Sequence, residues 1–260
     1  MKPPTPARSV TAVSRLGSAA LVAVLLVAWH VAVKFQASPI LPGPLAVGSG
    51  LLELSTRGLL LKYIVASLFR VTIGYLLAVA VAVPVGMLMG WFGTAHAFLN
   101  PLVQGLRPIS PIAWIPLAIL WFGVGDLAPI FLIFLSSCFP MVVGTAAGVM
   151  TIDRKYLRAA RNFEFTGFRL FRSVVLPAAL PQIVTGMRIG LGVAWLVVVA
   201  AEMIAVNSGL GYLIIDSRNA GNRYDLVVAG MFTIGVVGFL LDSLMRGLER
   251  LDEVRWRYET

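Results

Sequence analysis

Long apolar runs are the feature that most constrains what this chain can fold into. Residues 127–150 contain no charged side chain, and residues 182–206 contain only Arg188 and Glu202. A helix needs about 20 mainly apolar residues to cross the hydrocarbon layer, where every backbone polar group must be paired within the segment. The whole chain is 58% hydrophobic with a mean hydropathy of +0.88. These runs predict an all-α, polytopic membrane protein.

Six segments have the length and composition of transmembrane helices. The first follows Lys2, Arg8 and Arg15, which is the charge order of a signal peptide. Its apolar run is long and its small-x-small cleavage site is poor, so an uncleaved span is the better interpretation. Residues 1–16 and 249–260 are predicted to be cytoplasmic tails. The predicted spans are residues 17–33, 68–92, 98–122, 127–150, 182–206 and 226–248.

Two further patterns concern packing around these spans. The third span is interrupted by several prolines, which either kink it or leave carbonyl groups that line a pathway. Gly86 and Gly90 form a small-x-x-x-small pair that predicts close helix packing. Between the first two spans, Glu53 and Arg57 lie four residues apart on a predicted amphipathic helix at the membrane face. The apolar residues of that helix are Leu51, Leu52, Leu54, Leu59 and Leu60.

The distribution of basic residues predicts the orientation. With both termini inside, 13 Lys and Arg residues are cytoplasmic, and 6 are outside, Arg70 among them; Arg107 and Arg188 fall within spans. This asymmetry follows the positive-inside rule. Because the basic residues form no compact, aromatic-interleaved patch, a nucleic-acid partner is not expected.

The sequence contains no catalytic or metal-binding motif. Cys138 is the single cysteine, and His30 and His96 have no Cys or carboxylate cluster nearby, so neither a disulfide nor a metal site is expected. The sequence contains no G-x-x-x-x-G-K-[ST] phosphate loop and no G-x-S-x-G nucleophile elbow. No cofactor is therefore expected, and any ATP hydrolysis requires another chain. An intramembrane enzyme lacks a catalytic constellation.

Residues 151–181 form a basic, aromatic-rich loop on the predicted cytoplasmic side. Asp153 is placed to cap a helix that starts at residue 154, and Thr166 to cap a second short helix that ends before Pro177. On the first helix, Tyr156, Ala160 and Phe163 share one face, and Ala159 with Ala160 leaves a bare patch for close approach of another surface. The spacing alone is equally compatible with a positive-inside loop folded onto lipid headgroups.

Residues 158–205 resemble a known family. The sequence RAARNFEFTGFRLFRSVVLPAALP and the helix after it are similar to the cytoplasmic signature loop of binding-protein-dependent ABC importer permeases, in the group that serves nitrate, taurine, aliphatic sulfonates and bicarbonate. RPISPIAWIPLAILWFGVGD (107–126) and SGLGYLI (208–214) resemble the third span and the post-span segment of the same group. The resemblance covers residues 41–248 and implies a type I importer permease fold.

The signature loop of the family begins Glu-Ala-Ala, has a glycine four positions after the second alanine, and ends in Leu-Pro. Here Arg158 replaces the glutamate and Glu164 replaces the glycine. The glutamate is the larger departure because glycine permits positive φ, and Gly167 offers an alternative place for the turn. The resemblance assigns ATPase coupling to Arg158, Ala159, Ala160, Arg161, Phe163, Glu164, Gly167, Leu176 and Pro177.

The resemblance also implies an assembly in the bacterial cytoplasmic membrane. Two permease copies form a homodimer, two separate ATP-binding cassette subunits bind the loops, and a periplasmic or lipid-anchored solute-binding protein delivers the anion. ATP is bound by the partner subunits, and membrane lipid surrounds the spans. A stand-alone channel or a secondary carrier is the alternative, for which the purified chain alone supports transport.

Ionisable and polar residues within the spans are candidates for the translocation pathway, because such groups are expensive in a membrane. Arg107 and Arg188 suit an anion, although Arg188 also lies close enough to the span end to reach the headgroups. Glu202 and Asp242 either pair with a neighbouring helix or shape a gate. The candidate pathway residues are Arg107, Ser110, Trp114, Arg188 and Glu202.

Overall fold

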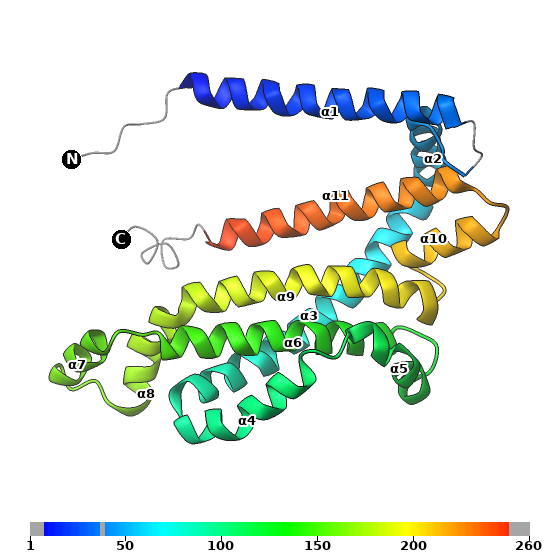
Figure 1. Ribbon diagram of the computed structural model, residues 1–260. Coiled ribbons are helices and arrows are strands. Elements are labelled where there is room, and N and C mark those ends of the chain that lie inside the picture. Colours follow the sequence, from blue (N-terminus) through cyan, green and yellow to red (C-terminus); the bar gives the residue numbers. More distant parts are fainter. Residues whose placement is uncertain (1–7, 37–39, 250–260) are drawn as a thin grey trace.

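The computed structural model describes residues 8–36 and 40–249, and within them every regular element is a helix. Figure 1 shows α6, α9 and α11 running alongside one another, with α3 crossing behind them. The longer helices are α1 (Arg8–Gln36), α3 (Leu59–Trp91), α6 (Leu127–Met150), α9 (Leu176–Ala205) and α11 (Tyr224–Glu249). The shorter ones are α2 (Pro44–Thr56), α4 (Gly93–Leu106), η1 (Pro111–Trp114), α5 (Ile115–Phe122), α7 (Arg154–Asn162), α8 (Gly167–Leu170), η2 (Phe171–Val175) and α10 (Leu210–Asn219).

Close backbone contacts hold α3, α6 and α9 together as the core of the molecule. A Cβ atom on Gly90 would lie 2.5 Å from the Cβ of Val149, and Gly86 meets α6 in the same way one turn earlier. Gly144 of α6 faces Gly186 of α9, where a Cβ on Gly144 would lie 3.0 Å from the Gly186 Cα. Small residues let helix backbones approach closely in a membrane protein. The predicted packing role of Gly86 and Gly90 is confirmed.

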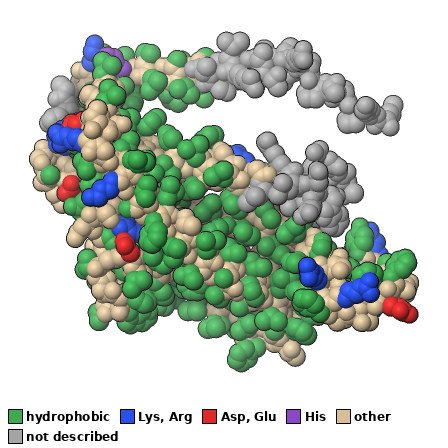
Figure 2. All heavy atoms as spheres, turned by 180° about the vertical axis from the view of Figure 1, so that it is seen from behind, with side chains coloured by type: hydrophobic (Ala, Val, Ile, Leu, Met, Phe, Trp, Pro, Cys, Tyr) green, Lys and Arg blue, Asp and Glu red, His purple; other side chains and the backbone are tan. Residues whose placement is uncertain are grey.

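Among residues 8–36 and 40–249, four helices are long and apolar enough to cross a membrane: Leu59–Trp91, Leu127–Met150, Gly167–Ala205 and Tyr224–Gly247. The helix pair Gly93–Leu106 and Pro111–Phe122 is a fifth candidate if it forms one broken span. The predicted first span lies in α1, whose apolar part, Ala20–Phe35, is shorter. Figure 2 shows hydrophobic side chains over most of the visible face between the two ends. The all-α membrane architecture is confirmed, while the count of six spans remains a prediction.

The predicted third span over residues 98–122 is not one straight helix. α4 ends at Leu106, and the chain bends by 83° before η1 and α5. Pro108 and Pro111 cause the break, because proline lacks a backbone N–H and disfavours helical geometry at the preceding residue. The segment is therefore two helices joined by a sharp bend, which is the geometry of a broken span or of a re-entrant loop.

The predicted amphipathic helix over residues 51–60 is also divided. α2 ends at Thr56 and α3 begins at Leu59, so the second span starts well before residue 68. The Glu53–Arg57 ion pair is present at 3.0 Å, and the other oxygen of Glu53 lies 2.6 Å from Arg223. The Arg223 hydrogen bond holds the pKa of Glu53 below its usual value. These contacts attach α2 to the start of α11, and the position of α2 on a membrane face remains a prediction.

Candidate functional site

A mostly exposed segment, residues 154–175, lies at one end of the molecule and comprises α7, α8 and η2. We call it the lever. Figure 1 shows it at the opposite end from α5 and α10, and Figure 2 shows basic and hydrophobic side chains together on its surface, at the right. We call the end with α5 and α10 the far end. The predicted sites divide between these two ends.

The first helix of the lever begins where the sequence predicts. The Asp153 carboxylate accepts a hydrogen bond from the Lys155 backbone N–H at 2.8 Å, as an N-cap does. This bond and the Lys155 side chain hold the pKa of Asp153 below its usual value. The predicted cap is confirmed. Thr166 takes the N-cap position of α8, but within the described residues its side chain makes no capping hydrogen bond.

The predicted bare patch of two alanines is wrong, because the two side chains point in different directions. Ala160 is 7% exposed and packs in a cluster with Val149 and Leu170, whereas Ala159 is exposed. Adjacent helix positions are about 100° apart, so only one of them can face the core. Of the residues predicted to share a face with Ala160, Phe163 is 77% exposed. The exposed coupling candidates are Arg158, Ala159, Arg161, Phe163, Glu164 and Gly167.

The lever turns at Glu164, the position that holds glycine in the resembled family. Glu164 has a φ of 60°, in the left-handed region. Its backbone N–H donates to the Arg161 carbonyl at 2.9 Å, and the Phe165 N–H donates to the Ala160 carbonyl at 3.0 Å. These two bonds form a Schellman motif with Glu164 at C′. The turn therefore stays at this residue, and Gly167 provides a second left-handed position, with a φ of 52°, at the start of α8.

The second helix of the lever does not end at Pro177 as predicted. α8 passes through a π-helical turn, η2, directly into α9, which contains Pro177 near its start and Pro181 further along. Proline is tolerated at the first turn of a helix, and the wider π turn precedes it. Gly167–Ala205 is consequently one 39-residue helical run, which begins before the predicted residue 182. Leu176 is half-buried at the junction.

The predicted pathway residues do not form one site. Arg107, Ser110 and Trp114 lie at the bend between α4 and α5, and Arg107 and Ser110 are exposed there. Arg188 and Glu202 are 14 residues apart on α9, which is about 21 Å along a helix axis. The structure thus divides these candidates among three places.

Arg188 pairs with the last helix. Its Nε donates to an Asp242 carboxylate oxygen at 2.8 Å, and the other oxygen lies 2.6 Å from Arg246. The pairing alternative for Asp242 is confirmed. Asp242 thus joins Arg188 of α9 to Arg246 of α11 at this part of the α9–α11 contact.

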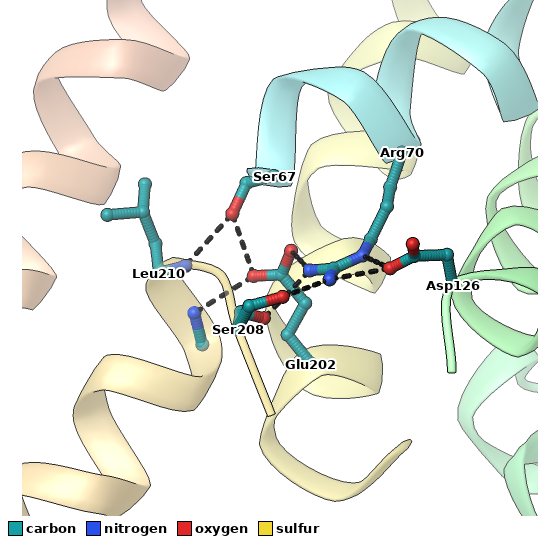
Figure 3. Close-up of polar contacts among 7 residues, drawn as sticks. Ser67, Arg70, Asp126, Glu202, Ser208 and Leu210 are labelled. Atoms are coloured by element: carbon teal, nitrogen blue, oxygen red, sulfur yellow. Dashed lines mark hydrogen bonds and ion pairs between the residues drawn. The ribbon is translucent and has the colours of Figure 1, made fainter. Parts of the chain in front are cut away.

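A buried ion cluster at the far end is the most highly connected polar site of the described residues (Figure 3). Arg70 of α3 is 2% exposed, and its Nη1 donates to Glu202 at 2.6 Å and to the Ser208 carbonyl at 2.7 Å. Its Nε donates to Asp126 at 2.8 Å, and Nη2 donates to the Ser208 hydroxyl. We call Ser67, Arg70, Asp126, Glu202, Ser208 and Leu210 the Arg70 cluster.

Glu202 and Ser67 also complete the N-terminus of α10. Glu202 is 0% exposed, and its Oε2 accepts from the Ser67 hydroxyl at 2.8 Å and from the Gly211 N–H at 3.0 Å. The Leu210 N–H donates to Ser67 Oγ at 2.9 Å. A carboxylate suits the positive end of a helix dipole. Gly209 is required beside it, because a Cβ there would lie 2.3 Å from the Glu202 carboxylate and φ is 107°.

The pairing alternative for Glu202 is confirmed, but the sequence reasoning missed its partner. The distribution of basic residues predicts Arg70 on the outer side, whereas its side chain is buried between α3 and its neighbours. The sequence does contain a signal for this pairing. Arg70 is the only charged residue from 63 to 91, and a lone intramembrane charge requires a partner. Within the described residues, no group of three His, Cys, Asp or Glu side chains is placed to hold a metal ion.

This architecture defines the class of protein. It is an all-helical membrane protein in which a long helix is joined to the exposed lever. Residues 82–251 match the family described as binding-protein-dependent transport system inner membrane component, and the chain belongs to that family. Three named relatives are each at least one-third identical. They are the taurine transport system permease protein TauC of Escherichia coli (37%; 88% of this chain, 86% of the relative), the putative aliphatic sulfonates transport permease protein SsuC of Bacillus subtilis (36%; 91% and 86%) and the nitrate import permease protein NrtB of Synechocystis (34%; 90% and 87%).

Solved structures support the fold independently. Two inward-facing crystal forms of the MetNI methionine ABC transporter contain a chain that superimposes with TM-scores of 0.65 and 0.63. Sequence identity is 19% and 17%, and the match covers 75% and 71% of this chain and 97% and 92% of the solved chains. At this identity the likeness establishes the fold, which is the predicted type I importer architecture.

Proposed function

We propose that this chain forms the translocation pathway of an ATP-driven importer for a small anion, of the nitrate, taurine, alkanesulfonate or bicarbonate class. The observation that carries the proposal is the lever, whose exposed helix α7 turns at Glu164 into the unbroken 39-residue helical run Gly167–Ala205. The names of the relatives, which concern taurine, aliphatic sulfonates and nitrate, support the substrate class.

In this proposal, the exposed face of α7 docks on a separate ATP-binding subunit. Arg158, Ala159 and Phe163 supply charge, close approach and an apolar contact there. Two copies of the chain pair in the cytoplasmic membrane with both termini inside, and a solute-binding protein delivers the anion to the far end. When two ATPase subunits close around ATP, they draw the two levers together. The chain itself hydrolyses no ATP.

The pathway is proposed to pass the bend between α4 and α5. Exposed Arg107 presents a guanidinium that suits nitrate, sulfonate or carboxylate oxygens. Ser110 and Trp114 flank the break, where the carbonyl groups are no longer committed to a helix. Arg188 contributes its guanidinium at the α9–α11 contact, beside Asp242 and Arg246. Glu202 is fully buried and contributes through Arg70 instead of by contact with the solute.

An Ala159→Asp variant tests the coupling. It places an unpaired carboxylate on the exposed docking face, without disturbing the buried Ala160 cluster. The matched control is Ala220→Asp, which makes the same change at an exposed position of the far end. We expect co-purification with the ATPase subunit to be lost in the first variant and kept in the second, and ATP-driven anion uptake to be lost in the first variant. Undiminished ATP-driven uptake by Ala159→Asp would contradict the proposal.

Uptake by the chain alone tests the alternative. The purified chain is reconstituted in liposomes without an ATPase subunit, and uptake of labelled nitrate, taurine and bicarbonate is measured. We expect no uptake until the ATPase subunits, the binding protein and ATP are added. Uptake at the full rate by the chain alone would favour a channel or a secondary carrier.

A further inference from the structure

The Arg70 cluster lies at the end of α9 that is farthest from the lever. We propose that Arg70 is a positioning residue for transport, and that its cluster is a permanently closed joint. This joint makes the start of α6 and the start of α10 move together with the end of α9. The inference rests on the proposed function, because it describes how movement of the lever reaches the far end.

The first step is the continuity of the helix between the two sites. The helical run from Gly167 to Ala205 contains 39 residues, which is about 58 Å at 1.5 Å per residue. Glu202 lies in its last turn. Gly186 and Gly190 pack closely on α6 along the way, so the run is supported over its length. A movement of the lever is therefore delivered to Glu202.

The second step is the convergence of separate elements on one guanidinium. Arg70 binds Glu202 of α9, Asp126 before α6 and Ser208 of the α9–α10 connection. The Gly125 N–H, next to Asp126, donates to the Ala205 carbonyl at 3.1 Å. The planar fork of an arginine fixes several acceptors in defined directions. The joint thus sets the orientation of each element relative to α9.

The third step concerns α10. The first N–H groups of a helix have no partner within it, and here the side chains of Glu202 and Ser67 satisfy those of Gly211 and Leu210. α10 is consequently fixed to the joint at its first turn. Because it begins only five residues after α9 ends, its direction depends on this attachment.

The fourth step separates positioning from stability. Replacing a buried ion pair by apolar residues of similar volume is often neutral or stabilising, whereas removing one partner is strongly destabilising. A buried pair such as Arg70–Glu202 is therefore weak as a source of stability, and its distinguishing property is directional hydrogen bonding. This difference makes the two roles separable by experiment.

The decisive variant is Arg70→Met combined with Glu202→Leu, studied in the full complex in proteoliposomes. We expect complex assembly and ATP hydrolysis to persist, while anion uptake per ATP hydrolysed falls at least about fivefold, at the lower end of typical coupling between sites. The matched control is Glu53→Gln combined with Arg223→Gln, which removes a half-exposed pair at α2. An unchanged uptake per ATP in the assembled double variant would overturn the proposal.

Arg70→Lys covers the case in which the double variant fails to assemble. Lysine keeps the charge but lacks the planar fork, so it cannot hold Glu202, Asp126 and Ser208 at once. We again expect a reduced ratio of uptake to hydrolysis, and an unchanged ratio in the assembled Arg70→Lys complex would overturn the proposal. The native complex is measured alongside. If it shows no ATP-driven uptake, the proposed function fails, independently of the joint.

A cross-link distinguishes a closed joint from a gate. Tyr63→Cys in α3 and Tyr212→Cys in α10, which lie outside the Arg70 cluster with ring centroids 6.2 Å apart, are introduced together with Cys138→Ala, and the two thiols are joined by a short, reducible reagent. A joint that stays closed during the cycle tolerates the link, so we expect uptake to be retained after cross-linking. Loss of uptake that a reductant restores would show that the cluster opens, and would overturn the joint.

Discussion

At the scale of single residues, Glu164 is the clearest departure from ordinary backbone geometry. It holds the C′ position of the lever helix with a φ of 60°, where a residue with a side chain costs roughly 1–2 kcal/mol. We therefore expect Glu164→Gly to raise the free energy of unfolding by about 1 kcal/mol. The midpoint of thermal unfolding in detergent measures the effect. Arg161→Gly, inside α7, is the control and is expected to lower the midpoint, whereas a lower midpoint for Glu164→Gly would contradict the explanation.

Asp153 gives the lever a dependence on pH. Its pKa lies below the usual value because the folded state binds the charged carboxylate. The stabilisation is therefore complete above the ordinary pKa of an aspartate and is lost as the pH falls through the lowered folded-state pKa. We expect the protection factors of the α7 amides, which correct for the slower intrinsic exchange at low pH, to fall on acidification. Asp153→Asn keeps a capping oxygen without titrating, so an equal pH dependence in that variant would exclude Asp153 as the cause.

The residue-scale predictions succeeded where the interaction is local. Asp153 contacts a residue two positions away, so its capping role follows from the sequence. The burial of Ala160 depends on how α7 is rotated against the core, and the Arg70–Glu202 pair joins residues 132 positions apart. A single sequence identifies such isolated charges but not which of them meet.

At the scale of elements, glycine packing between α3 and α6 is directly testable. A Cβ on Gly90 would lie 2.5 Å from Val149, while Gly235 on α11 has no neighbouring atom within 4 Å of an added Cβ in the described structure. We expect Gly90→Ala to destabilise the protein by about 1–3 kcal/mol through overpacking. Gly235→Ala is expected to be neutral or to stabilise it by up to about 1 kcal/mol. Equal thermal midpoints for the two variants would contradict close α3–α6 packing.

How well the bounds of a helix are predicted depends on what ends that helix. α6 matches the predicted residues 127–150, because its apolar run is bounded by Asp126 and by the loop at Thr151. Proline gave less certain boundaries. Pro108 and Pro111 break a span sharply, whereas Pro177 lies within the first turn of α9 after a π turn. The outcome depends on whether neighbouring turns supply the missing hydrogen bonds, which the sequence does not specify.

At the scale of the whole molecule, the lever and the Arg70 cluster lie at opposite ends of one packed unit. Glycine contacts join α3, α6 and α9 along their lengths, and α9 continues into the lever. A force applied to α7 therefore acts on the three core helices together. The bent α4–α5 segment packs on this unit through Val103, Ile115 and Ala118, and its bend leaves Arg107 and Ser110 exposed.

A substitution of Arg107, at that bend, is expected to affect transport without affecting assembly. We expect Arg107→Gln to lower ATP-driven anion uptake by about tenfold or more, since a charge-assisted hydrogen bond contributes roughly 1.5–3 kcal/mol. Complex assembly and thermal midpoint should change little, because Arg107 is exposed and lies outside the packed core. Arg218→Gln, at an exposed position of α10, is the matched control. Uptake that is equal in both variants would remove Arg107 from the pathway and leave Arg188, at the α9–α11 contact, as the remaining arginine candidate.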